Sequence, residues 1–581
     1  MTNETGVLDE NVPSAPENHP DGCGCSCCSE NTSENAEGTN SSGNGSGKRV
    51  ATLDELSDFL KTKYWGNPNW FNLSGSGVHA KSGTLTYNVS GSRFDSDGVS
   101  AQSAAHIKKA LDYVASVTGI NFVETTEETA DLNFTNNVKG KAFAGHGGYS
   151  WDRENGNWIV EYSRINLSEG GSHGNPNQKN GYFAHTTLHE IGHALGLGHQ
   201  GHYNGSGRYP NNTTFLNDSR LVSVMSYFGQ GENPTSGATN AVPQTFAAAD
   251  LLALDKIYGD QSYNGQTFGT SNAFLGDTVY GFNTNISAEG NRRMVDLARY
   301  GNNNSYTLVD GGGNDTLDLS GFRKATIDLR VTQADDTLPY SSSVEGERKN
   351  ISIAVGTVIE NAVGTRGNDK ITGNFADNHL WGGRGNDKMY GLEGDDHFYL
   401  EAGNDVMDGG EGSDWLHIDT DADMTVDLNR EELVSSFGRD RIISIENVDS
   451  GSGDDRLIGN EADNKLQGND GDDTLYGNEG NDYLKGGNGN DELYGGAGND
   501  RFDLDAGDDQ IHGGDGTDII YFYGRQDARV DLTENTIETA YGNDTISGIE
   551  SISAGHGNDY LRGNAENNSI RGNGGGRYHP W

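Results

Sequence analysis

The chain has 581 residues, and its 86 acidic against 40 basic side chains give a formal net charge of −46. So acidic a chain is unsuited to binding nucleic acid through phosphate contacts, which excludes that function class. Glycine accounts for 85 residues and proline for only 10, without a three-residue period, which excludes a collagen-like triple helix. No apolar run is long enough to cross a membrane.

The first 49 residues are rich in Asn, Gly, Ser and Glu, a composition typical of a disordered leader or propeptide. They contain no apolar stretch of the kind found in a secretory signal peptide. All four cysteines lie between Cys23 and Cys28, so no disulfide framework is expected in the rest of the chain.

A folded domain is predicted to follow, over residues 50–262. Apolar residues at helical or alternating spacing, with glycines after three of the helices, indicate four helices and two strands. In chain order these are a helix from Leu53, a strand at 84–89, a helix through 104–114 that stops at Gly119, a strand at 131–134, and helices at 183–195 and 246–258. This mixture favours one α+β domain.

Tandem nine-residue repeats dominate the remainder, 263–581. Six consecutive units fill 364–417 and eight more fill 450–521; a third block begins at Ala554 and is incomplete, with Arg577 where an Asp is expected. The eighth position is apolar in every unit of the first two blocks, and the sixth is Asp except at Asn378 and Asn464. A longer repeat surrounds the blocks, since Ile445-Glu446-Asn447 precedes the second and Ile549-Glu550-Ser551 the third.

This period predicts an all-β parallel β-roll, in which glycines form tight turns and each apolar residue points inward. Carboxylate and carbonyl oxygens in the turns are ligands that Ca²⁺ prefers, so several structural calcium ions are expected. The alternative, a flexible acidic linker, does not explain units that stay in register. The predicted calcium ligands are Asp369, Asp387, Asp396, Asp405, Asp414, Asp455, Asp473, Asp482, Asp491, Asp500, Asp509 and Asp518.

The strongest motif is His189-Glu190-Ile191-Gly192-His193, continued to Gly196 and His199. Residues four apart leave one face of a helix, so His189 and His193 can hold one Zn²⁺, and Gly196 lets the chain turn so that His199 supplies a third nitrogen. Three histidines leave the fourth position of the zinc open for water. Glu190 is predicted to take a proton from that water as general base and to deliver it to the leaving amine.

The segment Ser223-Val224-Met225-Ser226-Tyr227 lies downstream of this motif. Met225 can form an apolar floor beneath the histidines, although a methionine is more often an ordinary core residue. Together with this segment the zinc motif resembles the metzincin metalloproteases. The flanks (TTLHEIGHALGLGH and FAAADLLALDKIYG), followed by RTX-type nonapeptides, resemble the serralysin family over about residues 50–522.

The resemblance implies a metzincin catalytic domain followed by a calcium-loaded β-roll, and a broad-specificity zinc endopeptidase acting on proteins and peptides. It also implies that Tyr227 is a fifth zinc ligand that swings away and hydrogen-bonds the developing oxyanion, and that Met225 forms the Met-turn. Finally it implies a secreted extracellular protein exported by a type I machinery, although the C-terminal residues do not resemble that family's export signal. A monomer is expected.

Several hypotheses remain open beside this interpretation. A leader cysteine could occupy the fourth zinc position until the leader is removed. The favoured interpretation is instead that these thiols have no partner in the fold. If the leader is cleaved, the cut is expected between about Ser41 and Leu53. The spare histidines His146, His173, His185 and His202 are expected on the surface or in loops. The alternative functions are a calcium-dependent adhesin with a vestigial zinc helix, and a zinc hydrolase acting on another class of substrate.

Overall fold

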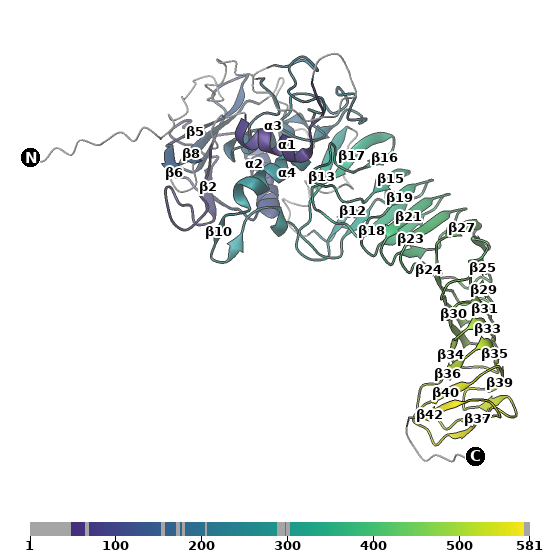
Figure 1. Cartoon of the computed structure of the whole chain (residues 1–581). Coiled ribbons are helices and arrows are strands. Elements are labelled where there is room, and N and C mark those ends of the chain that lie inside the picture. The colour runs from purple at the N-terminus through teal and green to yellow at the C-terminus, as the bar shows by residue number, and fades with distance from the viewer. Residues whose placement is uncertain are drawn as a thin grey trace, which may run out of the picture. The chain divides into compact units, whose positions relative to one another are not determined.

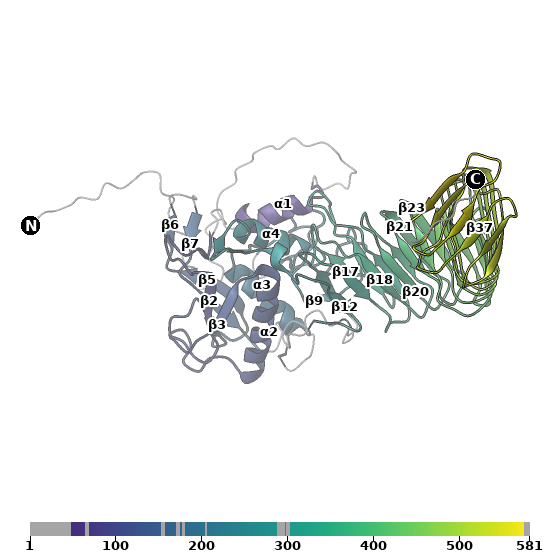
Figure 2. The same cartoon turned by 90° about the horizontal axis from the view of Figure 1, so that it is seen from below.

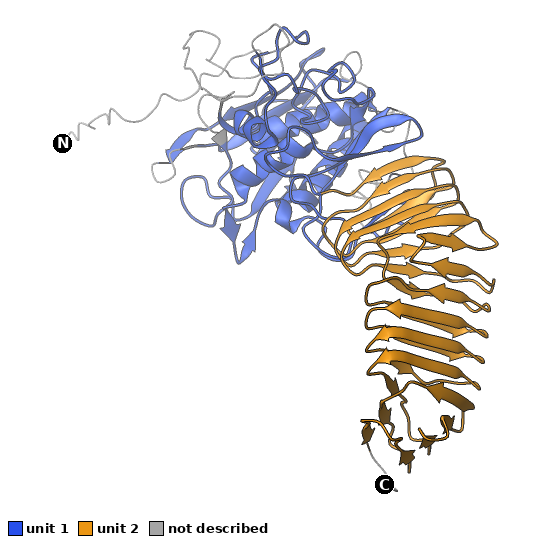
Figure 3. Cartoon of the chain, turned by 45° about the vertical axis from the view of Figure 1, so that its right-hand side comes forward, with its two compact units in different colours: residues 1–318, 331–359 blue, residues 319–330, 360–581 orange. Residues whose placement is uncertain are grey.

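The computed structural model describes residues 48–63, 69–152, 157–169, 175–176, 181–203, 206–286, 297 and 303–573, and the chain forms two compact units (Figure 3). The first unit is the chain up to Asp318 together with Val331–Ile359, and the second is Leu319–Arg330 together with the chain from Glu360 onward. The boundary predicted at 262/263 separates a catalytic domain from the repeats rather than these two compact units, and it stays a prediction. Of the predicted leader, only Lys48 and Arg49 lie within the described residues.

A five-stranded sheet forms one layer of the first unit, in the order β3-β2-β4-β8-β5 (Figures 1 and 2). The first four strands are parallel neighbours, and β5 is antiparallel to β8. The two predicted strands are confirmed as β2 and β4. The sheet consists of β2 (Thr84–Asn88), β3 (Asn121–Glu124), β4 (Leu132–Thr135), β5 (Ala142–Gly147) and β8 (Tyr162–Leu167).

The four predicted helices are confirmed, and their ends have physical causes. Thr52 Oγ1 accepts the Glu55 N–H at the start of the first, while Glu55 caps Thr52 in return. Gly119 ends the second with a φ of 73°, a conformation that favours glycine. The helices are α1 (Leu53–Asp58), which runs on into a short π-helical turn at Phe59–Lys63, α2 (Ala101–Thr118), α3 (Tyr182–Ala194) and α4 (Ala248–Tyr258).

Helix α3 lies at the centre of this unit, against β5, β8 and α2. Its apolar residues Leu188 and Ile191 are fully buried with Phe246 and Ile165 in one core cluster. The helix that carries the zinc motif is therefore held on several sides. The remaining elements of the unit are β1 (Asn69–Trp70), β6 (Ser150–Asp152), β7 (Asn157–Ile159), β9 (Val242–Pro243), β10 (Ser262–Tyr263), β11 (Gln266–Thr267), a 3-10 turn (Thr270–Asn272), β12 (Val279–Gly281), β13 (Asn304–Leu308), β14 (Thr316–Asp318), β16 (Ser341–Val344) and β17 (Glu347–Ile353).

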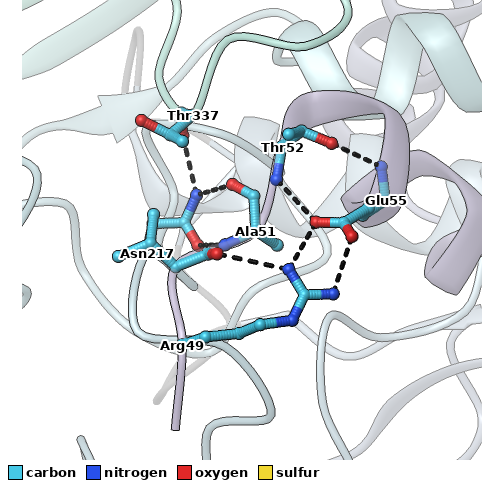
Figure 4. Close-up of polar contacts among 7 residues, drawn as sticks. Arg49, Ala51, Thr52, Glu55, Asn217 and Thr337 are labelled. Carbon is cyan, nitrogen blue, oxygen red and sulfur yellow. Dashed lines mark hydrogen bonds and ion pairs between the residues drawn. The ribbon is translucent and has the colours of Figure 1, made fainter. Parts of the chain in front are cut away.

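The segment before α1 is fastened to the body of the unit (Figure 4). Asn217 receives the Ala51 N–H on its Oδ1, and its Nδ2 donates to the carbonyls of Ala51 and Thr337. Arg49 donates two hydrogen bonds to Glu55, at 2.6 and 2.7 Å. Lys48 Nζ donates to three backbone carbonyls in 210–213. The folded unit thus includes Lys48 and Arg49.

The second unit is a roll of two parallel sheets, and within each nonapeptide block a strand pairs in register with the strand 18 residues on, as Leu466 does with Leu484. One sheet contains β18 (Asn361–Thr365), β20 (His379–Gly383), β22 (His397–Tyr399), β24 (Trp415–His417), β28 (Asn447–Asp449), β30 (Lys465–Asp470), β32 (Tyr483–Asn488), β34 (Arg501–Asp503), β36 (Ile519–Tyr521), β40 (Ser551–Ala554) and β42 (Ser569–Gly572).

The other sheet of the roll accepts two antiparallel insertions, β25-β26-β27 and β37-β38-β39, at the long repeats between the blocks. Its strands are β15 (Ala325–Asp328), β19 (Lys370–Thr372), β21 (Lys388–Glu393), β23 (Val406–Glu411), β25 (Thr425–Asp427), β26 (Glu432–Val434), β27 (Arg439–Ile443), β29 (Arg456–Ile458), β31 (Thr474–Glu479), β33 (Glu492–Gly498), β35 (Gln510–Gly516), β37 (Arg529–Asp531), β38 (Thr536–Glu538), β39 (Asn543–Ser547) and β41 (Tyr560–Arg562).

The eighth-position residues form the interior of the roll, as predicted. From Ile371 through Leu484 to Ile520 they are at most 1% exposed. The incomplete third block continues the same pairing as far as β42, whereas Arg577 lies outside the described residues. The predicted fold class, an α+β domain followed by an all-β parallel roll, is confirmed.

Candidate metal centre

The three predicted zinc ligands converge on one point. His189 and His193 leave one face of α3, and Gly196, with a φ of 106°, turns the chain so that His199 faces them. His199 Nε2 lies 3.2 Å from His189 Nε2 and 3.0 Å from His193 Nε2. The helix periodicity and the glycine turn therefore bring together the nitrogens that the sequence analysis selected.

The second nitrogen of each helical histidine is already engaged. His189 Nδ1 lies 2.9 Å from the Val224 carbonyl oxygen, and His193 Nδ1 lies 2.7 Å from that of Leu197. A carbonyl only accepts, so both Nδ1 atoms carry the proton and both Nε2 atoms present a lone pair. Burial also lowers the pKa of His189 to about 4 and those of His193 and His199 well below their usual value, which keeps all three imidazoles neutral.

This donor set fits Zn²⁺. Nitrogens about 2.0–2.1 Å from a tetrahedral zinc lie roughly 3.3–3.4 Å from one another. The observed separations of 3.2 and 3.0 Å are close to that value. The carbonyl bonds at Nδ1 orient the rings in the way that the outer partners of metal-binding histidines do.

Glu190 lies beside this cluster and is 5% exposed. Its Oε2 is buried and has no hydrogen-bond partner. Burial raises the pKa of Glu190 to about 8, against a smaller opposing effect of the Ala144 backbone. A carboxyl group with one uncommitted oxygen and a pKa near neutrality is suited to exchange protons at pH 7.

Met225 packs directly under the zinc motif. It is fully buried, and a Cβ added at Gly192 would lie 2.8 Å from its Sδ, so the glycine of the motif makes room for the methionine. Asp250 of α4 holds this turn: it accepts hydrogen bonds from Ser223 Oγ at 2.6 Å and from the Val224 N–H at 2.7 Å. Sequence analysis did not single out Asp250, and only its place in the first turn of a helix was a signal.

The Tyr227 ring stands near the histidines, with its centroid 4.6 Å from that of His199 and 6.1 Å from that of His189. Tyr203 packs against it, with centroids 4.7 Å apart. The hydroxyls of Tyr203 and Ser226 donate to buried Asp218, at 3.2 and 2.6 Å. Asp218 thus supports both neighbours of Tyr227, a role that no sequence pattern indicated.

Two of the spare histidines were assigned wrongly. His146 and His185 are 7% and 3% exposed, rather than lying on the surface, because one lies in β5 and the other on the inner face of α3. His202 is exposed as expected, and His173 lies outside the described residues. Within the described ranges, two groups of His, Cys, Asp or Glu can hold a metal ion, and the three zinc-motif histidines are one of them.

In the roll, the predicted Asp residues form rows along the turns. Within a block, a sixth-position N–H donates to the carboxylate 18 residues on, as from Asp473 to Asp491 Oδ1 at 2.8 Å. Burial, reinforced by the neighbouring carboxylates, raises the pKa of Asp473 and of Asp396 to about 8. Rows of buried like charges indicate that a cation belongs beside them.

The second oxygen of most row carboxylates is suited to bind a cation, because it is buried without a hydrogen-bond partner. A Cβ added at Gly477 would overlap Asp482 Oδ2 and would lie 2.5 Å from the Gly495 carbonyl oxygen, so carboxylate and carbonyl converge on that glycine. Such oxygen sets are what Ca²⁺ prefers. The partnerless Oδ2 atoms of the predicted set belong to Asp387, Asp396, Asp414, Asp455, Asp473, Asp482, Asp491, Asp500 and Asp518.

Four further carboxylates complete the rows and were not predicted as ligands. Asp440 and Asp544 accept the N–H groups of Asp405 and Asp509, at 2.7 and 3.0 Å. Glu446 and Glu550 do the same for the last Asp of each block. A signal was available, because Gly438-Arg439-Asp440-Arg441-Ile442 repeats the final Gly-x-Asp-x-apolar part of the unit.

Three family models match the chain. The model described as Matrixin matches residues 79–206, and that described as Peptidase M10 serralysin C terminal matches residues 270–437. The model described as RTX calcium-binding nonapeptide repeat (4 copies) matches 449–484, 485–520 and 553–576. The first covers the zinc motif, the second covers the end of the first unit and the first repeat block, and the third covers the later repeats.

Curated relatives agree with these models. Serralysin of Photorhabdus laumondii is 31% identical over 342 residues, which are 56% of this chain and 65% of that protein. Serralysin G of Dickeya chrysanthemi is 31% identical over 363 residues, 58% of this chain and 68% of the relative. Metalloprotease AprA of Pseudomonas entomophila is 32% identical over 358 residues, 58% and 67%.

The match thus spans just under two thirds of the Photorhabdus relative and slightly more than two thirds of the other two. The family models divide the chain in the same order as its own motifs do, with the zinc helix first and the nonapeptide roll after it. We conclude that the chain belongs to the serralysin family of metzincins with RTX repeats.

Proposed function

We propose that this protein is a secreted zinc endopeptidase that hydrolyses peptide bonds of proteins. The observation that carries the proposal is the buried, partnerless Oε2 of Glu190 beside three neutral histidines with converging lone pairs. A protein that used zinc only for structure would gain nothing from an uncommitted buried carboxyl group at that place.

His189, His193 and His199 would hold the zinc, which when bound supplies Lewis acidity and lowers the pKa of water. Glu190 takes a proton onto Oε2 as water attacks the scissile carbonyl and delivers it to the leaving amine. Burial raises the pKa of Glu190, which favours holding that proton on the carboxyl group until it passes to the leaving amine.

Tyr227 supplies the second polar group of this mechanism. Its phenol would donate a hydrogen bond to the oxyanion that develops on the substrate carbonyl, and in the resting protein Tyr227 would be a further residue that holds the zinc. Its ring is half-buried and packs against His199 and Tyr203.

The RTX repeats imply calcium in the roll, where we assign structural ions to the carboxylate rows. We further propose export by a type I machinery, an extracellular location, a monomer, and a leader that is removed on activation. The described part of the chain has no helix long and apolar enough to span a membrane.

The test is casein hydrolysis by the purified full chain in calcium, after removal of the leader. Glu190→Ala and a zinc-chelated sample are measured beside it, with zinc content determined in each. We expect turnover in the wild type alone, with zinc still bound to Glu190→Ala. Equal turnover by Glu190→Ala would refute the assignment of the base. Zinc-loaded wild type without turnover of casein or of a peptide library would refute the peptidase assignment in favour of a binding protein or another hydrolase.

A further inference from the structure

Arg220 is a half-buried cation beside the candidate metal centre, and its partners are uncharged. Its Nη2 donates to the Tyr182 hydroxyl at 2.7 Å, and its Nε donates to the Ser226 carbonyl at 3.3 Å. The guanidinium also lies over the Tyr182 ring, 5.1 Å from its centroid. Among the residues that the structure describes, no carboxylate forms an ion pair with Arg220. A guanidinium has five N–H donors, so this one keeps both its charge and some donors for a ligand.

Arg220 contacts the elements that carry the zinc motif and Tyr227. Tyr182 is the first residue of α3; its ring centroid lies 5.1 Å from that of His185, which lies 6.1 Å from that of His189. On its other side, Arg220 Nη2 lies 3.5 Å from the Tyr227 carbonyl oxygen. The guanidinium is therefore next to both the zinc helix and the turn that presents Tyr227.

A small pocket lies against Arg220. Its volume is about 10 Å³, enough for a group the size of one water molecule. Pro243 in its lining belongs to β9, which contacts α3. Of the described residues that line the pocket, Arg220 alone is charged. The lining includes Arg220, Gln230, Pro243, Thr245, Ser305 and Thr307.

Gln230 is an independent sign that this pocket receives a polar group. Its side chain is fully buried, and within the described part of the chain neither Oε1 nor Nε2 has a hydrogen-bond partner. A buried amide without partners is costly, and a bound group that accepts its N–H removes that cost. An amide and a guanidinium, both with donors to spare, thus line one pocket.

These donors favour a negatively charged oxygen. Hydrogen bonds from a guanidinium to a carboxylate are stronger than those to a neutral acceptor. The small volume suits one oxygen of a flat carboxylate better than a bulkier phosphate group. The alternative occupant is a single water molecule, which would satisfy Gln230 but would leave the charge of Arg220 without a counterion.

We propose that Arg220 and Gln230 form a subsite for the acidic side chain of a substrate residue close to the scissile bond. The inference rests on the proposed peptidase function and adds a substrate class to it. Arg220 is the specificity-determining residue, because its charge distinguishes Glu or Asp from the corresponding amides. Gln230 contributes by being neutral, since a carboxylate at its position would pair with Arg220 and close the subsite.

The test uses pairs of fluorogenic peptides that differ only in Glu against Gln, placed in turn at each position that flanks the cleaved bond. The zinc-loaded full chain, freed of its leader and kept in calcium, is compared with Arg220→Gln, Arg220→Lys and Gln230→Glu. The control is Lys108→Gln, which removes a cation already paired with Glu124 at 2.7 Å. Zinc content and circular dichroism show that each variant is folded.

We expect the wild type to cleave the Glu peptide with about tenfold higher kcat/KM than the Gln peptide at one position. The difference should lie mainly in KM, because the carboxylate is bound alike before and during the reaction. Arg220→Gln and Gln230→Glu should bring this ratio close to one. Arg220→Lys should give an intermediate ratio, since an ammonium keeps the charge without the planar donors. Lys108→Gln should keep the wild-type ratio.

Two results would overturn the subsite while leaving the peptidase assignment intact. One is a wild-type ratio near one at every position, which would mean that the pocket holds only water. The other is an unchanged ratio in Arg220→Gln or Gln230→Glu. If Arg220→Gln does not fold, Gln230→Glu decides the question, because it leaves Arg220 itself in place. A zinc-loaded wild type that cleaves no peptide of either series would overturn the peptidase assignment and the subsite together.

Discussion

Tyr227 and Glu190, the two polar residues proposed to act at the candidate zinc site, differ in burial and in how firmly they are held. Glu190 is buried on a helix that is fixed on several sides, whereas Tyr227 is half-buried at the end of an irregular turn. A proton-transferring group has to hold its place, and a group that leaves the zinc to meet the substrate has to move. The two environments agree with the two roles that we propose.

Tyr227→Phe isolates the contribution of the phenol. It removes one hydrogen-bond donor to the oxyanion and keeps the ring that packs on His199 and Tyr203, so we expect kcat to fall about a hundredfold while KM changes little. Steady-state kinetics with a fluorogenic peptide, at equal zinc content, measures this. Unchanged kcat would show that the hydroxyl does not act in the reaction.

Asp250 is expected to act on the zinc site through the turn that it holds. Asp250→Ala leaves the donors of Ser223, Val224 and Ala247 without an acceptor, and the Val224 carbonyl that orients His189 loses its support. We expect zinc affinity to fall about ten- to a hundredfold, as for other outer partners of metal ligands. Zinc retention against a chelator tests this, with exposed Asp260→Ala as control; equal retention by both variants would contradict the role.

At the scale of elements, the segment before α1 behaves as part of the folded unit. Asn217 satisfies both backbone groups of Ala51 as well as the Thr337 carbonyl, and it is fully buried. A single side chain therefore joins three stretches of chain that are far apart in the sequence.

Asn217→Ala is predicted to lower the free energy of unfolding of the first unit by about 2 kcal/mol, because buried backbone groups lose their partners. Thermal unfolding in calcium measures the loss. Asn211→Ala is the control, since Asn211 is exposed and a surface change should stay within about 0.5 kcal/mol. Equal melting temperatures for the two variants would contradict the stabilising role of the Asn217 hydrogen bonds.

The same contacts bear on maturation. Cleavage after Lys48 would remove its hydrogen bonds to the carbonyls of 210–213. Cleavage after Ala51 would also remove the hydrogen bonds between Ala51 and Asn217. We therefore expect the mature N-terminus at or before Lys48, in the first part of the interval between Ser41 and Leu53. N-terminal sequencing of the active protein decides this, and a mature chain that starts at Leu53 would refute it.

At the scale of the whole molecule, folding of the roll brings acidic side chains close together, so its stability depends on how their charge is neutralised. The row carboxylates lie close together because the sheet pairing places sixth positions 18 residues apart in register. Without a cation, the roll confines like charges that an unfolded chain could separate. Calcium removal is therefore expected to destabilise the roll far more than the sheet of the first unit.

The calcium-free protein should show an unusual dependence on pH. Burial raises the pKa of row carboxylates such as Asp396 and Asp473 from 3.8 to about 8, so the folded state binds more protons than the unfolded state between about pH 4 and pH 8. Stability then falls as pH rises through that window. We expect the melting temperature of the chelated roll, followed by circular dichroism, to be higher at pH 5.5 than at pH 8. The opposite order would contradict the shifted pKa values, and the calcium-loaded protein serves as the comparison.

Several elements of this architecture were predicted from the sequence because they depend on residues close together along the chain. The helix from Leu53, the helix that carries His189 and His193, and the nonapeptide turns each follow from spacing within a few residues. Strands β3 and β5 were not predicted, because β3 is largely exposed and β5 (Ala142–Gly147) contains little β-branched sequence. Their pairing with β2 and β8 supplies what their own residues do not.

The amino-acid sequence alone was sufficient to select the three histidines that converge in the candidate metal centre, and the identity and register of the repeats, since each is encoded by residues close together along the chain. Only the tertiary structure decided that Asp250 holds the turn under the zinc motif, that Asp218 supports Tyr203, and that Asp440 and Asp544 continue the rows. It also decided that Arg220 and Gln230 line one pocket. These contacts join residues whose separation in sequence has no fixed period, so their chemistry depends on which elements pack together.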